Sequence, residues 1–251
     1  MTRTRIRRLF GRNSVPRAAS DIVLQLHSAI DGYATSIVPL LRASYGSDCV
    51  QQAWREFTLN SSTLFTVDDA HCELFFSWLF HCWSPAPERG NHLADTSLYG
   101  QPPTRTYLAR QRRLNPHLRR YLEACLETSL GFYEIAECRP NISFRVEELS
   151  TRTELEVIDR VASTSLTDGD IVFARIPCVD GISIMDAISP VSFPPSFRTQ
   201  VSARQHTPEP CKHSELSLRT LYFELLETCL WRVGKELPSA SGVGTRRPRL
   251  H

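Results

Sequence analysis

The chain has 251 residues, enough to bury a sizeable core in one large domain or two small ones. Its apolar fraction of 41% and charged fraction of 22% are ordinary for a globular protein, and a net charge of +2 argues neither for nor against nucleic acid as a partner. No apolar run approaches the roughly 20 residues of a membrane-spanning helix, and no apolar segment of a signal peptide follows the N-terminus, so we expect no membrane partner.

The eight cysteines are scattered along the chain and form no C-x-x-C pair. Several fall inside apolar periodic runs, where free cysteine behaves as a small hydrophobic residue. This usage fits a reducing compartment better than a disulfide framework, so the sequence predicts a cytoplasmic protein. The cysteines are Cys49, Cys72, Cys82, Cys125, Cys138, Cys178, Cys211 and Cys229.

Residues 1–19 are rich in arginine and contain no acidic residue, which predicts a disordered basic tail. A nucleic-acid-binding arm and a targeting segment are the alternatives for this stretch. Its arginines are Arg3, Arg5, Arg7, Arg8, Arg12 and Arg17.

Residues 20–130 are predicted to form a helical region. A first helix should begin at Ser20-Asp21, although Gly32 and Pro39 interrupt the pattern of one continuous helix. A second helix is predicted over residues 51–59. A third should carry Asp68-Asp69 in its first turn, where negative charge suits the helix dipole, and run to about residue 83. The third helix is apolar nearly all round, which predicts that it is buried.

Residues 84–103 contain four prolines and two glycines and are predicted to form a long connection. Two helices should follow over residues 104–113 and 116–129, the second with Pro116 at a favourable first-turn position.

Residues 101–120 form the strongest local basic patch, with six arginines and no acidic residue. They are expected either to form a solvated face paired with acids such as Glu123 and Glu127, or to contact the phosphates of a nucleic acid. These possible contact residues are Arg105, Arg110, Arg112, Arg113, Arg119 and Arg120.

Residues 131–200 are predicted to form a small β unit. Four or five short apolar runs, with strands expected at 132–138, 142–147, 154–157, 171–176 and 182–185, are separated by turn signals such as Asp168-Gly169 and Asp180-Gly181. The run at 171–176 is apolar on both faces apart from Arg175, which favours a central strand, and the last two runs should form a hairpin. Strands this short cannot each bury an apolar face alone, which predicts that they form a small antiparallel barrel or a curled sheet.

The remaining residues, 201–236, are predicted to form a linker and a C-terminal helix over 216–233, and residues 237–251 a disordered tail. The proline-rich stretch 189–210 should cross the surface as extended chain. The predicted fold class is therefore α+β: an N-terminal helical region packed with a small antiparallel β barrel or curled sheet, plus a C-terminal helix.

No complete catalytic motif occurs in the sequence, and no P-loop, G-x-G-x-x-G, G-x-S-x-G or H-E-x-x-H is present. Residues 71–73 match the H-x-E half of a zinc deaminase signature, but the P-C-x-x-C half is missing. The His-Cys pairs at 71–72 and 81–82 lie almost three helical turns apart, so they cannot share one metal within that helix, and we expect core or helix-end roles for them. Because no set of four ligands is visible, no metal and no cofactor are predicted.

Five aspartates are conceivable catalytic carboxylates: Asp68, Asp69, Asp168, Asp170 and Asp180. Helix capping explains the first two and turn chemistry the other three, so no catalytic residue is assigned.

Four segments carry a family resemblance: FFSWLFHCWSP (75–85), RRYLEACLETSLGFYEIAE (119–137), LTDGDIVFARIPCVDGISIMDA (166–187) and PVSFPPSFR (190–198). Together they resemble an uncharacterised bacterial domain found upstream of SEC-C metal-binding motifs. The resemblance covers roughly residues 50–200 and implies a shared fold without an assigned activity. The SEC-C motif itself is absent from this chain, so its zinc-dependent partner binding is not implied.

Three functions follow as expectations. The first is a non-enzymatic interaction module with an unknown protein partner, because no catalytic constellation is visible. The second is a nucleic-acid-binding protein that uses the arginine clusters. The third is an enzyme with a non-contiguous active site, which a deep pocket lined by His71, Asp168 or Asp170 would support.

Overall fold

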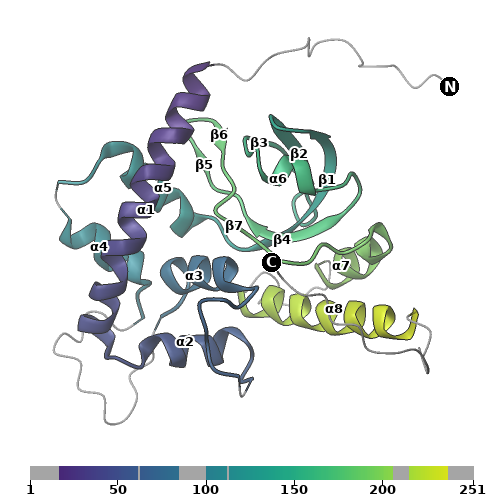
Figure 1. Cartoon of the computed structure of the whole chain (residues 1–251), viewed down its shortest axis with the longest axis horizontal. Helices are drawn as coiled ribbons and strands as arrows, with labels where there is room; N and C mark the ends of the chain where they lie inside the picture. Colours follow the sequence, from purple (N-terminus) through teal and green to yellow (C-terminus); the bar gives the residue numbers. More distant parts are fainter. Residues whose placement is uncertain (1–16, 62, 85–99, 112, 206–214, 237–251) are drawn as a thin grey trace, which may run out of the picture.

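The computed structural model describes residues 17–61, 63–84, 100–111, 113–205 and 215–236. Within this part of the chain, N-terminal helices pack beside a seven-stranded, strongly curled half-barrel, and a long C-terminal helix completes the α+β fold (Figure 1). The predicted fold class is confirmed. The predictions for residues 1–16, for most of the connection after residue 84, for residues 206–214 and for the tail at 237–251 lie outside the described residues.

Helix α1 (Arg17–Tyr45) begins three residues before the predicted start at Ser20-Asp21, so residues 17–19 are helical and do not belong to a disordered tail. It is continuous through Gly32 and Pro39, the two residues that disfavour one unbroken helix. Tyr33, Ile37 and Leu41 recur at a spacing of four and are all buried, so packing on both sides of Pro39 stabilises the helix against the cost of proline.

Helices α2 (Cys49–Phe57) and α3 (Cys72–His81) lie beside each other near the lower end of α1 (Figure 1). Helix α3 is largely buried, as predicted, and its aromatic residues pack against those of α2. The predicted start of this helix at Asp68-Asp69 is wrong. These residues precede the helix, where an Asp69 carboxylate oxygen accepts a hydrogen bond of 2.8 Å from the backbone N–H of His71.

Helices α4 (Pro103–Arg110) and α5 (Pro116–Glu127) agree with the two helices predicted there. Both begin at a proline, whose fixed φ suits the first turn of a helix. The side chain of Asn115 also caps α5 by accepting a hydrogen bond from the backbone N–H of His117.

The sheet is one curled layer in the order β5-β6-β3-β2-β1-β4-β7. Its strands are β1 (Gly131–Arg139), β2 (Ser143–Glu148), β3 (Glu154–Val157), β4 (Ile171–Arg175), β5 (Cys178–Val179), β6 (Ile182–Ser183) and β7 (Ala187–Ile188). All its pairings are antiparallel except the one between β3 and β6, which is parallel and makes the sheet mixed.

The hairpin predicted between residues 171–176 and 182–185 is wrong in its pairing. Asp180 and Gly181 do form the turn, but they link β5 to β6, while β4 lies between β1 and β7 as a central strand. Pro177 follows β4 and has no N–H to donate, so the β4 ladder cannot continue into this hairpin.

The sheet has two apolar faces because side chains alternate along each strand. In β4, Phe173 faces the large core shared with the helices, whereas Val172 and Ala174 face the interior of the half-barrel. The short helix α6 (Ala162–Ser165), which the sequence did not predict, packs Ala162 against this interior. The fold therefore has two cores on opposite sides of one sheet.

The chain leaves the sheet through the 3-10 turn η2 (Pro195–Phe197) and helix α7 (Arg198–Gln205), so the extended course predicted for residues 189–210 is wrong there. Arg198 holds α7 to the sheet through ion pairs with Glu134 at 2.5 Å and Glu147 at 3.2 Å. Helix α8 (Glu215–Glu236) confirms the predicted C-terminal helix. Its Tyr222 stacks on Phe173, with 4.9 Å between the ring centroids.

Candidate functional site

A cavity of about 780 Å³ lies between helices α1 and α3 and the end of the half-barrel that carries β4, β7 and α6. This volume is in the range of small-molecule sites, about 300–1,000 Å³. Most of its wall is apolar, with Ile30 from α1, Phe76 and Phe80 from α3, and Met185 and Ile188 from the β7 region. The side chains around Asp186 form a polar end of the cavity, which is the candidate functional site, and Glu73, Asp159 and Ser165 are further polar residues of the lining.

The carboxylate of Asp186 is the centre of this polar end. Asp186 lies between β6 and β7, where its backbone N–H donates to the carbonyl of Arg175 over 3.0 Å. The Ser77 hydroxyl donates to Oδ2 over 2.5 Å, and the Tyr121 hydroxyl donates to Oδ1. Ser77, Tyr121 and Asp186 all line the cavity, so three elements of the fold bring their polar atoms to one place.

Arg175 supplies the positive charge that balances this carboxylate. Its side chain is fully buried on β4, with Nε 3.7 Å from Oδ2 of Asp186. Its other nitrogens donate to the carbonyl of Cys125 over 2.6 Å and to the sulfur of Cys82 over 2.8 Å. Burial acts to raise the pKa of Asp186, but His81, Arg175 and the two hydroxyl donors outweigh it and hold that pKa below its ordinary value.

His81 lies one helical turn after Ser77 on the same face of α3. Its Nδ1 lies 2.9 Å from the hydroxyl oxygen of Thr104, which in turn lies 2.5 Å from the hydroxyl of Tyr33. Its Nε2 lies 4.0 Å from Oδ1 of Asp186. Burial lowers the pKa of His81 to about 3, so the ring is neutral at neutral pH.

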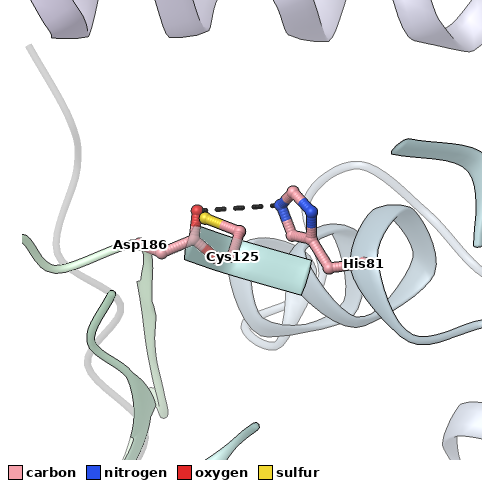
Figure 2. Close-up of side chains that lie close together, drawn as sticks. All are labelled: His81, Cys125 and Asp186. Carbon is pink, nitrogen blue, oxygen red and sulfur yellow. Dashed lines mark ion pairs between the residues drawn. The ribbon is translucent and has the colours of Figure 1, made fainter. Parts of the chain in front are cut away.

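Cys125 completes a group of three possible metal ligands with His81 and Asp186, whose ligand atoms all lie within 4.8 Å of one another (Figure 2). The set provides the N, S and O donors that zinc accepts. However, burial raises the pKa of the Cys125 thiol well above its ordinary value, so a metal would have to displace the thiol proton on binding. The guanidinium of Arg175 already balances Asp186, so this geometry favours a neutral polar network over a metal centre.

The arginines predicted to contact nucleic acid do not line the cavity. Arg119 pairs with Glu123 at 3.8 Å, and Arg120 pairs with Asp180 at 3.1 Å. The other described arginines of the patch are Arg105, Arg110 and Arg113, which are exposed and form no ion pair with the described residues. Arg110 donates a hydrogen bond to the Ser44 hydroxyl over 3.4 Å. Arg112 lies outside the described residues.

An enzyme with a non-contiguous active site was expected to have a pocket lined by His71, Asp168 or Asp170, and none of these residues lines the cavity. His71 contacts Asp69 at 3.3 Å, Asp168 accepts a hydrogen bond from the backbone N–H of Cys138, and Asp170 accepts one from Ser192. These contacts fit the helix-end role expected for His71 and the turn roles expected for the two aspartates.

Ser77, Tyr121 and Asp186 were not predicted as site residues, and His81 was expected to have only a core or helix-end role. Two of the site residues do have a visible signal. Ser77 and His81 are polar residues four apart on a helix that is otherwise apolar on its buried side, and this spacing places both on one face. The structure places Asp186 beside both, hydrogen-bonded to Ser77 and 4.0 Å from Nε2 of His81.

No helix in the described part of the chain is long and apolar enough to cross a membrane. Comparisons of the chain with family models, with curated proteins and with solved structures give no match. The resemblance to the bacterial domain upstream of SEC-C motifs therefore stays a prediction.

Proposed function

We propose that this chain is a non-catalytic interaction module that binds a small, mostly apolar molecule in the cavity between α1, α3 and the half-barrel. The observation that carries this proposal is a cavity of about 780 Å³ whose lining is mostly apolar and which has a hydrogen-bonded group of polar side chains around Asp186. Sites for small molecules have this composition, because apolar walls provide affinity and a few fixed polar groups provide orientation.

The chemistry of the polar end supports binding rather than catalysis. Ser77 donates to the carboxylate of Asp186, whose pKa is held below its ordinary value by its charged and hydrogen-bonding neighbours, so this partner is a weak base for activating the serine as a nucleophile at neutral pH. His81 has a pKa of about 3, far below that of an efficient general base at neutral pH. The Cys125 thiol does not line the cavity.

The test is the binding of N-phenyl-1-naphthylamine, a neutral dye that fluoresces in apolar surroundings. Ala34 lies on α1 at the cavity and is exposed, whereas Ala43 is exposed on the same helix away from the cavity. We expect saturable binding of one dye per chain, weakened at least tenfold by Ala34→Trp and unchanged by the matched control Ala43→Trp. The proposal fails if binding does not saturate, or if both variants bind the dye as the parent protein does.

Nucleic-acid binding is a second candidate, supported by the exposure of Arg105, Arg110 and Arg113 without a carboxylate partner among the described residues. Backbone binding of this kind weakens steeply as salt rises. The test is a salt series with mixed single- and double-stranded nucleic acid, comparing the parent protein with a variant in which these three residues are glutamate. Equal retention of both proteins would reject this candidate.

A further inference from the structure

The polar end of the cavity has a gap between one nitrogen and one oxygen. Nε2 of His81 and Oδ1 of Asp186 lie 4.0 Å apart, as the dashed line in Figure 2 marks, and both residues line the cavity. This separation is too long for a direct hydrogen bond. It does suit one oxygen atom that contacts both, at about 2.8 Å from each.

The hydrogen bonds that link His81, Thr104 and Tyr33 determine whether Nε2 of His81 is a donor or an acceptor in this gap. In one direction Tyr33 donates to Thr104 and Thr104 donates to Nδ1 of His81, so the ring proton lies on Nε2. If these hydrogen bonds run in the opposite direction, the ring proton lies on Nδ1, and the lone pair of Nε2 then faces the Asp186 carboxylate, which is repulsive. The first direction is therefore favoured, and the gap presents an N–H donor on one side and a carboxylate acceptor on the other.

The charges at the polar end also restrict the charge of the ligand head group that can bind there. Asp186 is already paired with Arg175, and a second cation beside it would leave an unbalanced positive charge in a buried site. A carboxylate ligand would be repelled by Asp186 and by the other two carboxylates of the lining, Glu73 and Asp159, and neither lysine nor arginine occurs among the described residues that line the cavity. The N–H of His81 also opposes an ammonium group, which has no acceptor to offer it.

We propose that the cavity takes a neutral alcohol, with its apolar chain between α1 and α3 and its hydroxyl bridging His81 and Asp186. The hydroxyl oxygen accepts from Nε2 of His81, and its proton is donated to Oδ1 of Asp186. A hydroxyl fits both sides of the gap because it is at once a donor and an acceptor. This inference rests on the proposed ligand-binding function and adds the chemical class of the ligand.

The experiment displaces bound N-phenyl-1-naphthylamine with three molecules that share one eight-carbon chain: 1-octanol, octanoate and octylamine at neutral pH. Since the chains are identical, differences in affinity report the head group. We expect 1-octanol to bind at least tenfold more tightly than either charged molecule. We also expect His81→Phe, which keeps an aromatic ring at this position and removes both nitrogens, to abolish this preference.

The matched control is His71→Phe, since His71 does not line the cavity, and it should leave the preference for 1-octanol unchanged. If the dye binds but octylamine or octanoate matches or exceeds 1-octanol, the head-group inference fails while the cavity remains a ligand site. The head-group inference also fails if His81→Phe binds the dye and keeps the full preference. If the dye itself does not bind saturably, the proposed function fails as well.

Discussion

Asp186 is the residue on which the polar end depends, because it accepts from two hydroxyls and balances a buried guanidinium. Asp186→Asn leaves Arg175 buried without a counter-charge, and breaking a buried pair in this way costs about 3–5 kcal/mol. We expect a loss of about that size in the free energy of unfolding, measured by urea titration.

Asp180 provides the matched control for this substitution. It also pairs with an arginine, Arg120, at 3.1 Å, but 41% of its side chain is exposed, compared with 9% for Asp186. Exposed pairs contribute about 0–1 kcal/mol, so Asp180→Asn should cost less than about 1 kcal/mol. Equal losses for the two variants would contradict the role assigned to the buried pair.

His81 makes stability depend on pH in a defined window. Its pKa is lowered to about 3 by burial, whereas the unfolded chain has the ordinary value of about 6.5. Below pH 6.5 the unfolded state binds a proton that the folded state does not, so stability falls as pH falls toward 3. Between pH 7 and pH 5 this single group should remove about 2 kcal/mol of stability.

The contribution of His81 is isolated by comparison with His81→Phe. Other groups titrate in both proteins, so the difference in their unfolding free energies at pH 7 and at pH 5 reports His81 alone. We expect the variant to lose about 2 kcal/mol less than the parent on acidification. Parallel pH profiles for the two proteins would mean that His81 is not buried in its neutral form.

At the scale of elements, the turn before β4 requires a residue in the left-handed region. Gly169 has φ +89, and its N–H donates to the carbonyl of Ile135 over 2.7 Å. A Cβ added there would lie 3.1 Å from Cγ of Pro195. Gly169→Val should therefore lower the unfolding free energy by about 1–3 kcal/mol, visible as a lower Tm.

Gly32 serves as the control for this turn, because it is exposed within α1 and nothing lies within 4 Å of a Cβ added there. Gly32→Val should be neutral or slightly stabilising, since valine tolerates a helix better than glycine does. An unchanged Tm for Gly169→Val would show that the turn accommodates a side chain.

The strands β1 to β4 could be predicted because alternation and turn dipeptides are local signals, whereas the closure of the sheet could not. The parallel pairing of β3 with β6 rests on a strand of two residues, whose register depends on tertiary packing. The site was hidden for a similar reason. Asp186 follows a two-residue strand, and its hydroxyl partners Tyr121 and Ser77 lie 65 and 109 residues away in the chain.

At the scale of the whole molecule, the predicted helical region and the predicted β unit share one hydrophobic core. Phe132 and Phe173 of the sheet belong to the same buried cluster as residues of α1, α2, α3, α5 and α8. The second cluster is smaller and fills the interior of the half-barrel. A small core behind a sheet whose other face is covered by helices has little stability of its own, so we expect the two regions to unfold together.

This cooperativity can be measured by placing the substitution in one region and the reporter in the other. Three of the four tryptophans, Trp54, Trp78 and Trp83, lie in the helical region, and Val146 is fully buried in the half-barrel interior. Val146→Ala should cost on the order of 2 kcal/mol and shift the urea midpoint equally when followed by tryptophan fluorescence and by far-UV circular dichroism. Val67→Ala, at a position that is 72% exposed, should shift neither midpoint. A fluorescence midpoint that stays in place while the dichroism curve splits would mean that the half-barrel unfolds as a separate domain.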